Sequence, residues 1–211
     1  MTKRQVGSGV AEGGSGPPTP TERTRTRVGG RSAEVRRAVG RACLAFLSEG
    51  RIDFTTVELA ERAGVSRKTV YRWWPTQNDL LIEGLSMHVR QVVSPDTGSW
   101  ETDVREFAHQ VAEYAADPVE VATAALMATR RHPEFGDLVV EQYDTVRQGW
   151  QQMVVRAIER GEATNEHPPV AVINTLVSPL FMAPMMLGRQ ANDEEIERIV
   201  KIVLAATRPP G

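Results

Sequence analysis

A short run of cationic and hydroxyl side chains, RKTVYR at residues 67–72, has the clearest capacity for chemistry in this sequence. Guanidinium and ammonium groups donate hydrogen bonds to phosphates and to guanine edges, and hydroxyl groups also bind phosphates. Val70 is the main apolar residue of the run, so little of the segment can belong to a core. The composition predicts a short exposed helix that reads the major groove of duplex DNA.

The flanking residues predict how such a helix is held in place. A first helix is expected to begin near Thr55 and to end at Gly64, because glycine adopts the left-handed conformation that a helix end often requires. Ser66 is placed to cap the second helix by accepting a backbone N–H. The chain turns at Pro75, since the residue before a proline avoids the α region. Thr76 is then placed to cap a third helix, whose N-terminal amides favour a phosphate.

An ordinary solvated helix pair would share some of these features. Here, however, the small, apolar, capping and turn residues of 60–81 all fall in one register, which favours a helix-turn-helix that binds DNA. We expect the DNA-contacting residues to be Thr55, Thr56, Ser66, Arg67, Lys68, Thr69, Tyr71, Arg72, Thr76 and Gln77.

The segment 36–81 resembles the N-terminal domain of the TetR family of transcriptional regulators. The run VELAERAGVS at 57–66 is similar to the family's second helix and turn, and TVYR at 69–72 is similar to its recognition helix. The residues WPT at 74–76 stand where the family commonly has Phe, Pro and a capping Ser or Asn. At Gln77 the family often has a lysine that touches the DNA backbone, so this contact lacks its charge here. The resemblance implies a homodimer that binds an operator and a small-molecule effector.

The charge distribution supports a polyanionic partner although the formal net charge is only −2. Residues 1–76 contain 14 Lys and Arg against 7 Asp and Glu, whereas the remainder contains 11 against 20. A basic front and an acidic rear suit a molecule that presents one end to nucleic acid.

Catalytic and metal-binding patterns are not found in the sequence. The histidines at 88, 109, 132 and 167 are scattered without metal-ligand spacing, and no glycine-rich phosphate loop or nucleophile with an evident base is seen. The single cysteine, Cys43, is expected to be a small core residue. We therefore expect no cofactor, no metal and no enzymatic activity. No secretory signal is evident, so a cytoplasmic location is expected.

The helical periodicities predict an all-α protein in three parts. Residues 1–30 are rich in Gly, Ser, Pro and Thr, and are expected to form a disordered basic tail, either simply solvated or serving as an arm on DNA. Residues 31–76 are expected to form a three-helix DNA-binding domain, with its first helix starting at Ser32. Residues 77–211 are expected to form a linking helix, running to about Val93, and a helical bundle for effector binding and dimerisation.

Methionine and aromatic residues within 77–211 are candidates for an effector pocket. Each could equally be plain core, but as a group beside two helix-kinking prolines they suit an adaptable apolar pocket. The candidates are Met127, Tyr143, Trp150, Phe181, Met182, Met185 and Met186.

Residues 168–188 contain no charged side chain. Their length approaches that of a membrane span, but Asn174, Pro179 and Pro184 make a poor lipid-facing helix, so no membrane contact is expected. A helix shared between two copies of the chain explains the composition better. With the apolar stripe of the last helix it would form a four-helix interface containing Ile173, Val177, Ile196, Ile199, Val200 and Val203.

These features together predict a homodimeric repressor that binds a palindromic operator and is released by a small-molecule effector. Two alternatives stay open on the residues alone. The body could bind a protein partner instead of a metabolite, or the regulator could activate transcription. A helical enzyme with an incidental helix-turn-helix is a further alternative, although no catalytic constellation favours it.

Overall fold

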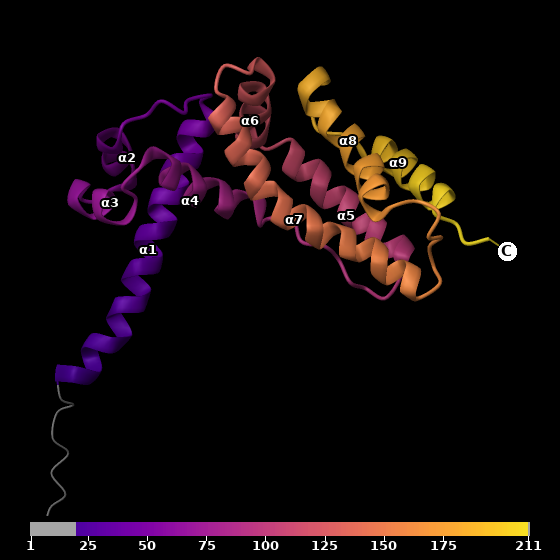
Figure 1. The fold of residues 1–211 in the computed structure, drawn as a ribbon, viewed down its shortest axis with the longest axis horizontal. Coiled ribbons are helices and arrows are strands. Elements are labelled where there is room, and N and C mark those ends of the chain that lie inside the picture. Colours follow the sequence, from indigo (N-terminus) through magenta and orange to yellow (C-terminus); the bar gives the residue numbers. More distant parts are fainter. Residues whose placement is uncertain (1–19, 211) are drawn as a thin grey trace, which may run out of the picture. The chain divides into compact units, whose positions relative to one another are not determined.

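The computed structural model describes residues 20–210, with side chains from Gly30 onward. All regular secondary structure in this range is helical (Figure 1), as the sequence predicted. Residues up to Val35 and residues from Arg36 form separate units, and packing is described for the second. The helices are α1 (Pro20–Ser48), α2 (Thr56–Ala63), α3 (Arg67–Trp73), α4 (Gln77–Val89), α5 (Trp100–Ala115), α6 (Pro118–Thr129), α7 (Pro133–Glu159), α8 (Pro169–Leu187) and α9 (Asp193–Ala206).

Helix α1 begins at Pro20, twelve residues before the predicted start at Ser32. Once a helix is nucleated, each added residue gains one backbone hydrogen bond, so a polar segment can extend an existing helix. The predicted disordered tail falls largely on residues 1–19, which lie outside the described range. That part of the expectation stays a prediction.

The predicted helix ends of the helix-turn-helix are confirmed. Thr55 caps α2 and forms a capping box with Glu58, whose side chain accepts a hydrogen bond from the Thr55 backbone N–H at 2.7 Å. Gly64 ends α2 with a φ of 64°, a conformation that other residues rarely adopt. Ser66 caps α3 by accepting the N–H of Thr69 at 3.2 Å. The turn between the helices is therefore fixed by local hydrogen bonds.

Helix α4 connects residues 36–76, which we call the head, to the bundle that follows, which we call the body. Its packed glycine, Gly84, lies against Cys43 of α1 on the head side. Beyond this point α4 packs along α7 of the body. The helix ends at Val89, four residues before the predicted end at Val93, and Arg90 has a helical conformation at its C-terminus.

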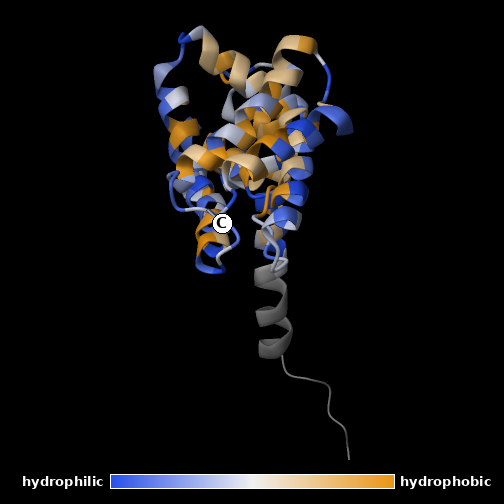
Figure 2. Ribbon diagram, turned by 90° about the vertical axis from the view of Figure 1, so that its right-hand side faces the viewer, coloured by the Kyte–Doolittle hydropathy of each residue, from blue (hydrophilic) through white to orange (hydrophobic). Residues whose placement is uncertain are grey.

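The core of the body lies between α5, α7, α8 and α9. Phe107, Met153, Leu176 and Val200 are fully buried there, one from each helix. Figure 2 shows that the hydrophobic stretches lie on the helices, whereas the loops that connect the helices are mainly hydrophilic. The indole N–H of Trp100 also donates a buried hydrogen bond of 2.8 Å to Thr207, which fixes the end of α9 against α5.

Four of the six residues predicted for the dimer interface belong to this core instead. They are Ile173, Ile196, Val200 and Val203, whose exposed fractions are 3%, 1%, 0% and 1%. The apolar stripe of a helix at the edge of a bundle is buried first against its own chain, so these side chains are not available to a partner. The structure corrects the assignment for these four residues. Val177 and Ile199 are partly buried at the edge of the same core.

Helix α8 is long and apolar enough to cross a membrane by length and composition. In the structure it packs against α5, α7 and α9, and Leu176 and Leu180 on its inner face are fully buried. These contacts are those of a bundle helix. Only 28% of an 18-residue apolar stretch of α8 is buried, however, so the outer face of this helix is uncovered within one chain.

Candidate nucleic-acid interface and ligand cavity

Helix α3 is anchored through one face and exposes the other. Val70 is fully buried, whereas the neighbouring Tyr71 is 54% exposed. Lys68 and Arg72 are exposed, and neither forms an ion pair within the part of the chain that the structure describes. Arg67 is also exposed, but its guanidinium is 2.8 Å from a carboxylate oxygen of Glu61 on α2. Two cations are thus available without rearrangement, and a third is available once it leaves Glu61.

Two other arginines of the head are engaged in internal contacts. The guanidinium groups of Arg51 and Arg62 lie 4.9 Å and 4.5 Å from the centroid of the Phe46 ring. Arg51 also pairs with Glu58 at 2.9 Å, and Arg62 pairs with Glu49. These cation–π and ionic contacts hold the loops of the head together.

The hydroxyl groups that were predicted to contact DNA at the starts of α2 and α4 form hydrogen bonds within the helix caps. The hydroxyl of Thr55 donates to Glu58 at 2.8 Å, and that of Thr76 donates to Asp79 at 2.7 Å. The backbone N–H of Thr55, with help from Arg51, lowers the pKa of Glu58 to about 2. Glu58 is therefore a carboxylate at neutral pH, and it already accepts the backbone N–H of Thr55 at the start of α2. Thr56, next to Thr55, is partly buried, and so is Thr69, whose hydroxyl is 2.8 Å from that of the α3 cap Ser66.

Gln77 has a structural role that the sequence did not reveal. Its side-chain amide donates to the carbonyl of Phe54 at 3.2 Å and also to the carbonyl of Ile52. These bonds tie the start of α4 to the loop that precedes α2, so the amide positions the head in this structure.

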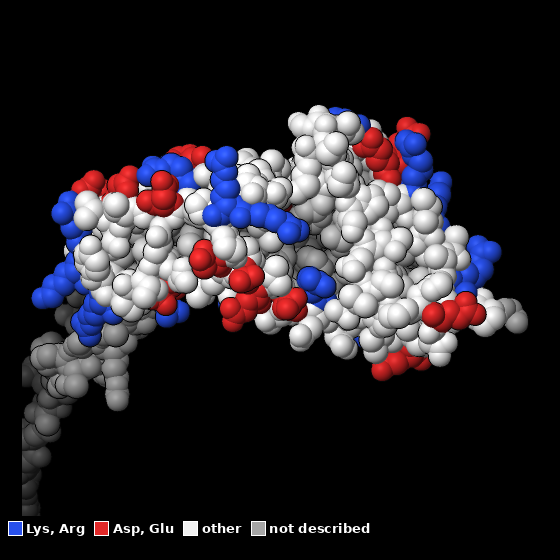
Figure 3. Space-filling view, turned by 45° about the horizontal axis from the view of Figure 1, so that its top comes forward, with Lys and Arg blue, Asp and Glu red and all other residues white. Residues whose placement is uncertain are grey.

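Sequence reasoning missed cations of α1 that lie near the head. Arg36, Arg37 and Arg41 are exposed on the part of α1 that belongs to the head. Figure 3 shows the Lys and Arg side chains of the head at its surface, interspersed with acidic groups. The signal was present as a run of arginines at helical spacing, which is typical of a face that meets phosphate.

A cavity of about 530 Å³ lies between α6, α7 and α8. Four of the seven predicted effector residues, Met127, Tyr143, Trp150 and Phe181, line it together. The other three, Met182, Met185 and Met186, lie elsewhere on α8 with exposed fractions of 50%, 45% and 70%. The lining residues that were not predicted for the effector pocket are Glu120, Val139, Val140, Arg147, Ile173, Asn174, Val177 and Ser178.

Glu120 is the one acidic residue among those that line this cavity, most of which are apolar or aromatic. It is 6% exposed, and its Oε2 accepts a hydrogen bond from the Tyr143 hydroxyl, which in turn contacts the hydroxyl of Tyr114. Burial and the nearby Glu120 carboxylate raise the pKa of Tyr143, so that hydroxyl stays protonated and donates. The buried His88 of α4 also contacts Glu120, with its Nε2 3.4 Å from the same Oε2. The lone charge in the apolar run 119–127 was the sequence signal for this residue.

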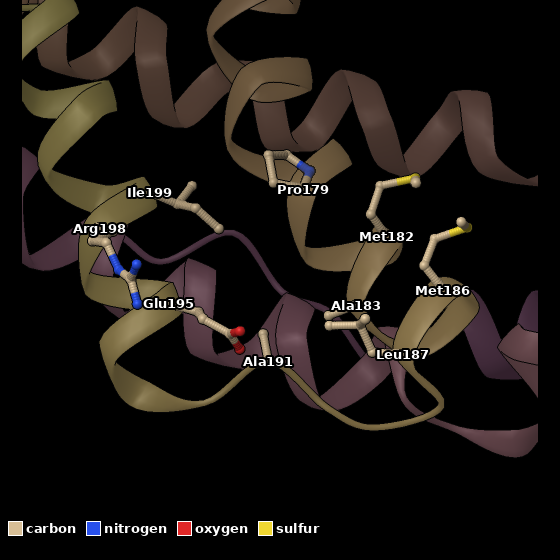
Figure 4. Close-up of a pocket in the computed structure, with 9 residues that line it drawn as sticks. All are labelled: Pro179, Met182, Ala183, Met186, Leu187, Ala191, Glu195, Arg198 and Ile199. Carbon is tan, nitrogen blue, oxygen red and sulfur yellow. The ribbon is translucent and has the colours of Figure 1, made fainter.

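A second hollow lies between α8 and α9 at the surface. Met182 and Met186 extend from the same side of α8 along this hollow (Figure 4), and Ile199 lines it from α9. Ile202 of α9 is 61% exposed, and Leu187 at the end of α8 is 61% exposed. The outer faces of α8 and α9 thus carry large apolar side chains in contact with water.

Comparisons with known proteins agree with the helical fold and with a helix-turn-helix. The family model described as tetracyclin repressor-like, C-terminal domain, matches residues 94–203. The regulator AqdR from Rhodococcus erythropolis is 31% identical over 153 residues, covering 70% of this chain and 71% of AqdR. The uncharacterised regulator Rv1556 from Mycobacterium tuberculosis is 25% identical over 173 residues, covering 80% and 86%. A TetR regulator structure from Agrobacterium tumefaciens has a TM-score of 0.68 at 20% identity, covering 82% and 95%.

The helical fold, the helix-turn-helix of the head and the similarity to known regulators together define the class of this protein. It is a DNA-binding transcriptional regulator of the helix-turn-helix class. More particularly, the chain belongs to the TetR family, as its N-terminal residues suggested. Members of this family bind DNA as dimers and respond to small molecules. It is a family of regulators and not of enzymes. Within the described residues no cluster of three or more His, Cys, Asp or Glu could hold a metal ion.

Proposed function

We propose that this chain is a cytoplasmic homodimeric repressor with a DNA-binding head, a linking helix α4 and an effector-binding body. Its two α3 helices lie in adjacent major-groove half-sites of a palindromic operator. The observation that carries this is the exposed cationic face of α3, where Lys68 and Arg72 have no ion-pair partner among the residues that the structure describes, while Val70 is fully buried. A helix held by one side chain and exposing its cations is suited to lie in a groove.

The uncovered face of α8 and α9 supports pairing with a second copy. Exposed apolar side chains of this extent are uncommon on a stable monomer, and a four-helix contact between two copies would cover them. In place of the buried residues predicted from the sequence, the proposed interface uses the exposed side chains Val170, Met182, Met185, Met186, Leu187 and Ile202, together with Ile199 at its edge.

A ligand in the cavity between α6, α7 and α8 has a physical route to the head. Glu120 and Tyr143 line the cavity, and Glu120 contacts His88 on α4. A ligand that engages this carboxylate changes the surroundings of α4, which carries Gly84 packed against the head. The ligand lowers operator affinity by the difference in its own affinity for the two positions of α4.

The operator is first to be obtained by selecting bound fragments from genomic DNA, and affinity then measured by fluorescence anisotropy over a salt series. We expect Arg67→Ala and Lys68→Ala each to weaken operator binding by about tenfold, and Lys68→Ala to reduce the slope of log K against log salt by about one. Arg131→Ala, an exposed cation in the turn after α6, is the matched control. Unchanged binding by both head variants would contradict the assignment of α3.

Transcription from the selected operator, measured in vitro with and without the protein, tests the direction of regulation. We expect less transcript when the protein is present, because a dimer over a promoter excludes polymerase. An increase would identify an activator. A protein partner for the body, the other alternative, predicts that the cavity binds no small molecule.

A further inference from the structure

Glu120 presents one carboxylate oxygen to the cavity without a protein partner. Tyr143 and His88 both approach Oε2, whereas Oε1 accepts no hydrogen bond from the described residues. The side chain is 7% exposed and its residue lines the cavity. The carboxylate is thus held through Oε2 and keeps Oε1 as an acceptor, an arrangement that favours a ligand that supplies a donor or a positive charge there.

The rest of the cavity wall specifies the other part of such a ligand. The rings of Tyr143, Trp150 and Phe181 line the cavity, and aromatic faces attract cations as well as apolar groups. The remaining wall is mainly aliphatic, with the polar side chains of Asn174 and Ser178 from α8. A volume of about 530 Å³ is in the range that holds a drug-sized molecule.

Arg147 is the one cationic side chain among the residues that line the cavity, and it lies toward solvent. Its side chain is 41% exposed, and its guanidinium is 3.5 Å from Asp144 one turn earlier on α7. Its charge is therefore screened by water and opposed by Asp144. Glu120 is the one acidic side chain among the residues that line the cavity, and it is buried.

We propose that the cavity binds lipophilic monocations, such as amines or quaternary ammonium compounds with an aromatic or aliphatic body. Oε1 of Glu120 pairs with the positive group, while Trp150, Phe181 and the aliphatic wall enclose the apolar part. This inference rests on the proposed function insofar as the cavity is the effector site. It adds the chemical class of the effector.

The test uses two probes of nearly equal size and opposite charge, tetraphenylphosphonium and tetraphenylborate, titrated into the purified full chain by calorimetry. We expect saturable binding of the cation that is at least about tenfold tighter than that of the anion. Glu120→Gln should weaken binding of the cation by about tenfold or more and leave the affinity for the anion unchanged. Glutamine keeps an acceptor for Tyr143 but removes the charge. Glu113→Gln, an exposed carboxylate on α5, is the control.

Equal or tighter binding of the anion, no binding of the cation, or an unchanged affinity in the Glu120→Gln variant would each overturn the proposal. Operator binding measured on the same preparations separates this outcome from failure of the proposed function. A protein that binds its operator but not the cation is a regulator with another class of effector. Thermal unfolding of each variant shows whether the fold is intact.

Discussion

The sulfur of Cys43 lies 2.8 Å from the position that a Cβ on Gly84 would occupy, so α1 and α4 approach more closely here than any larger residue allows. The Cβ of Cys43 is 3.0 Å from the same point. This contact joins the head to the helix that continues into the body, and the absence of a side chain at Gly84 is what permits it.

Gly84→Ala should therefore destabilise the protein although alanine is the better helix former. Overpacking of this kind costs about 1–3 kcal/mol, which outweighs the gain of about 1 kcal/mol in helix propensity. The double variant Cys43→Ala/Gly84→Ala should recover part of the loss, because it removes the sulfur while the Cβ of residue 43 stays close to the added Cβ. Urea unfolding checks both, and Gly149→Ala on α7, where nothing lies within 4 Å of the added Cβ, should not destabilise. Additive effects of the two substitutions would contradict the contact.

The ion pair between Arg67 and Glu61 competes with DNA for a cation of α3. The two groups are 2.8 Å apart with 59% and 66% exposed side chains. Glu61→Gln should raise operator affinity by about three- to tenfold, since it releases Arg67 and removes a negative charge near the phosphates. Anisotropy titration at fixed salt measures this, with the exposed Glu134→Gln as control. Weaker binding would mean that Glu61 holds Arg67 in its DNA-binding position.

The dimer interface can be assigned by comparing two residues of α9 that lie on opposite faces. Ile202 is 61% exposed, and Val200 is fully buried in the core of its own chain. Ile202→Glu should give a folded monomer, because a carboxylate at the interface opposes association without disturbing the core. Val200→Glu should instead unfold the body, since it buries an unpaired charge. Light scattering after gel filtration, with circular dichroism, distinguishes the two. If the Ile202→Glu variant is still a dimer, the interface lies on another surface of the protein.

The thiol of Cys43 should be unreactive in the folded protein. Burial raises its pKa to about 12, so at pH 8 almost none of it is thiolate, the reactive form. In the unfolded chain the pKa returns to its ordinary value near 9 and the thiol becomes accessible. Reaction with a disulfide reagent at pH 8 should thus be slow in buffer and fast in denaturant. Rapid reaction in buffer would show that α1 separates from α4 in the folded state.

The sequence alone was sufficient for the elements whose signals are local. The caps at Ser66 and Thr76 and the left-handed end at Gly64 depend on residues within one turn, and all were confirmed. Helical periodicity likewise identified the all-α fold, and the register of the head residues identified the family. These signals lie in the backbone preferences of single residues and in their spacing.

Tertiary structure decided which partner each side chain has. The apolar stripe containing Ile196 and Val200 is the same whether it meets its own chain or a second copy, and only packing shows that it is core. Nothing in the sequence around Gln77 indicates its hydrogen bond to the carbonyl of Phe54, which is 23 residues earlier in the chain. Glu120 was visible as a lone charge in an apolar run, but its place beside His88 of α4 depends on how α4, α6 and α7 pack. Contacts between distant residues follow from the packing of whole helices, which no local spacing encodes.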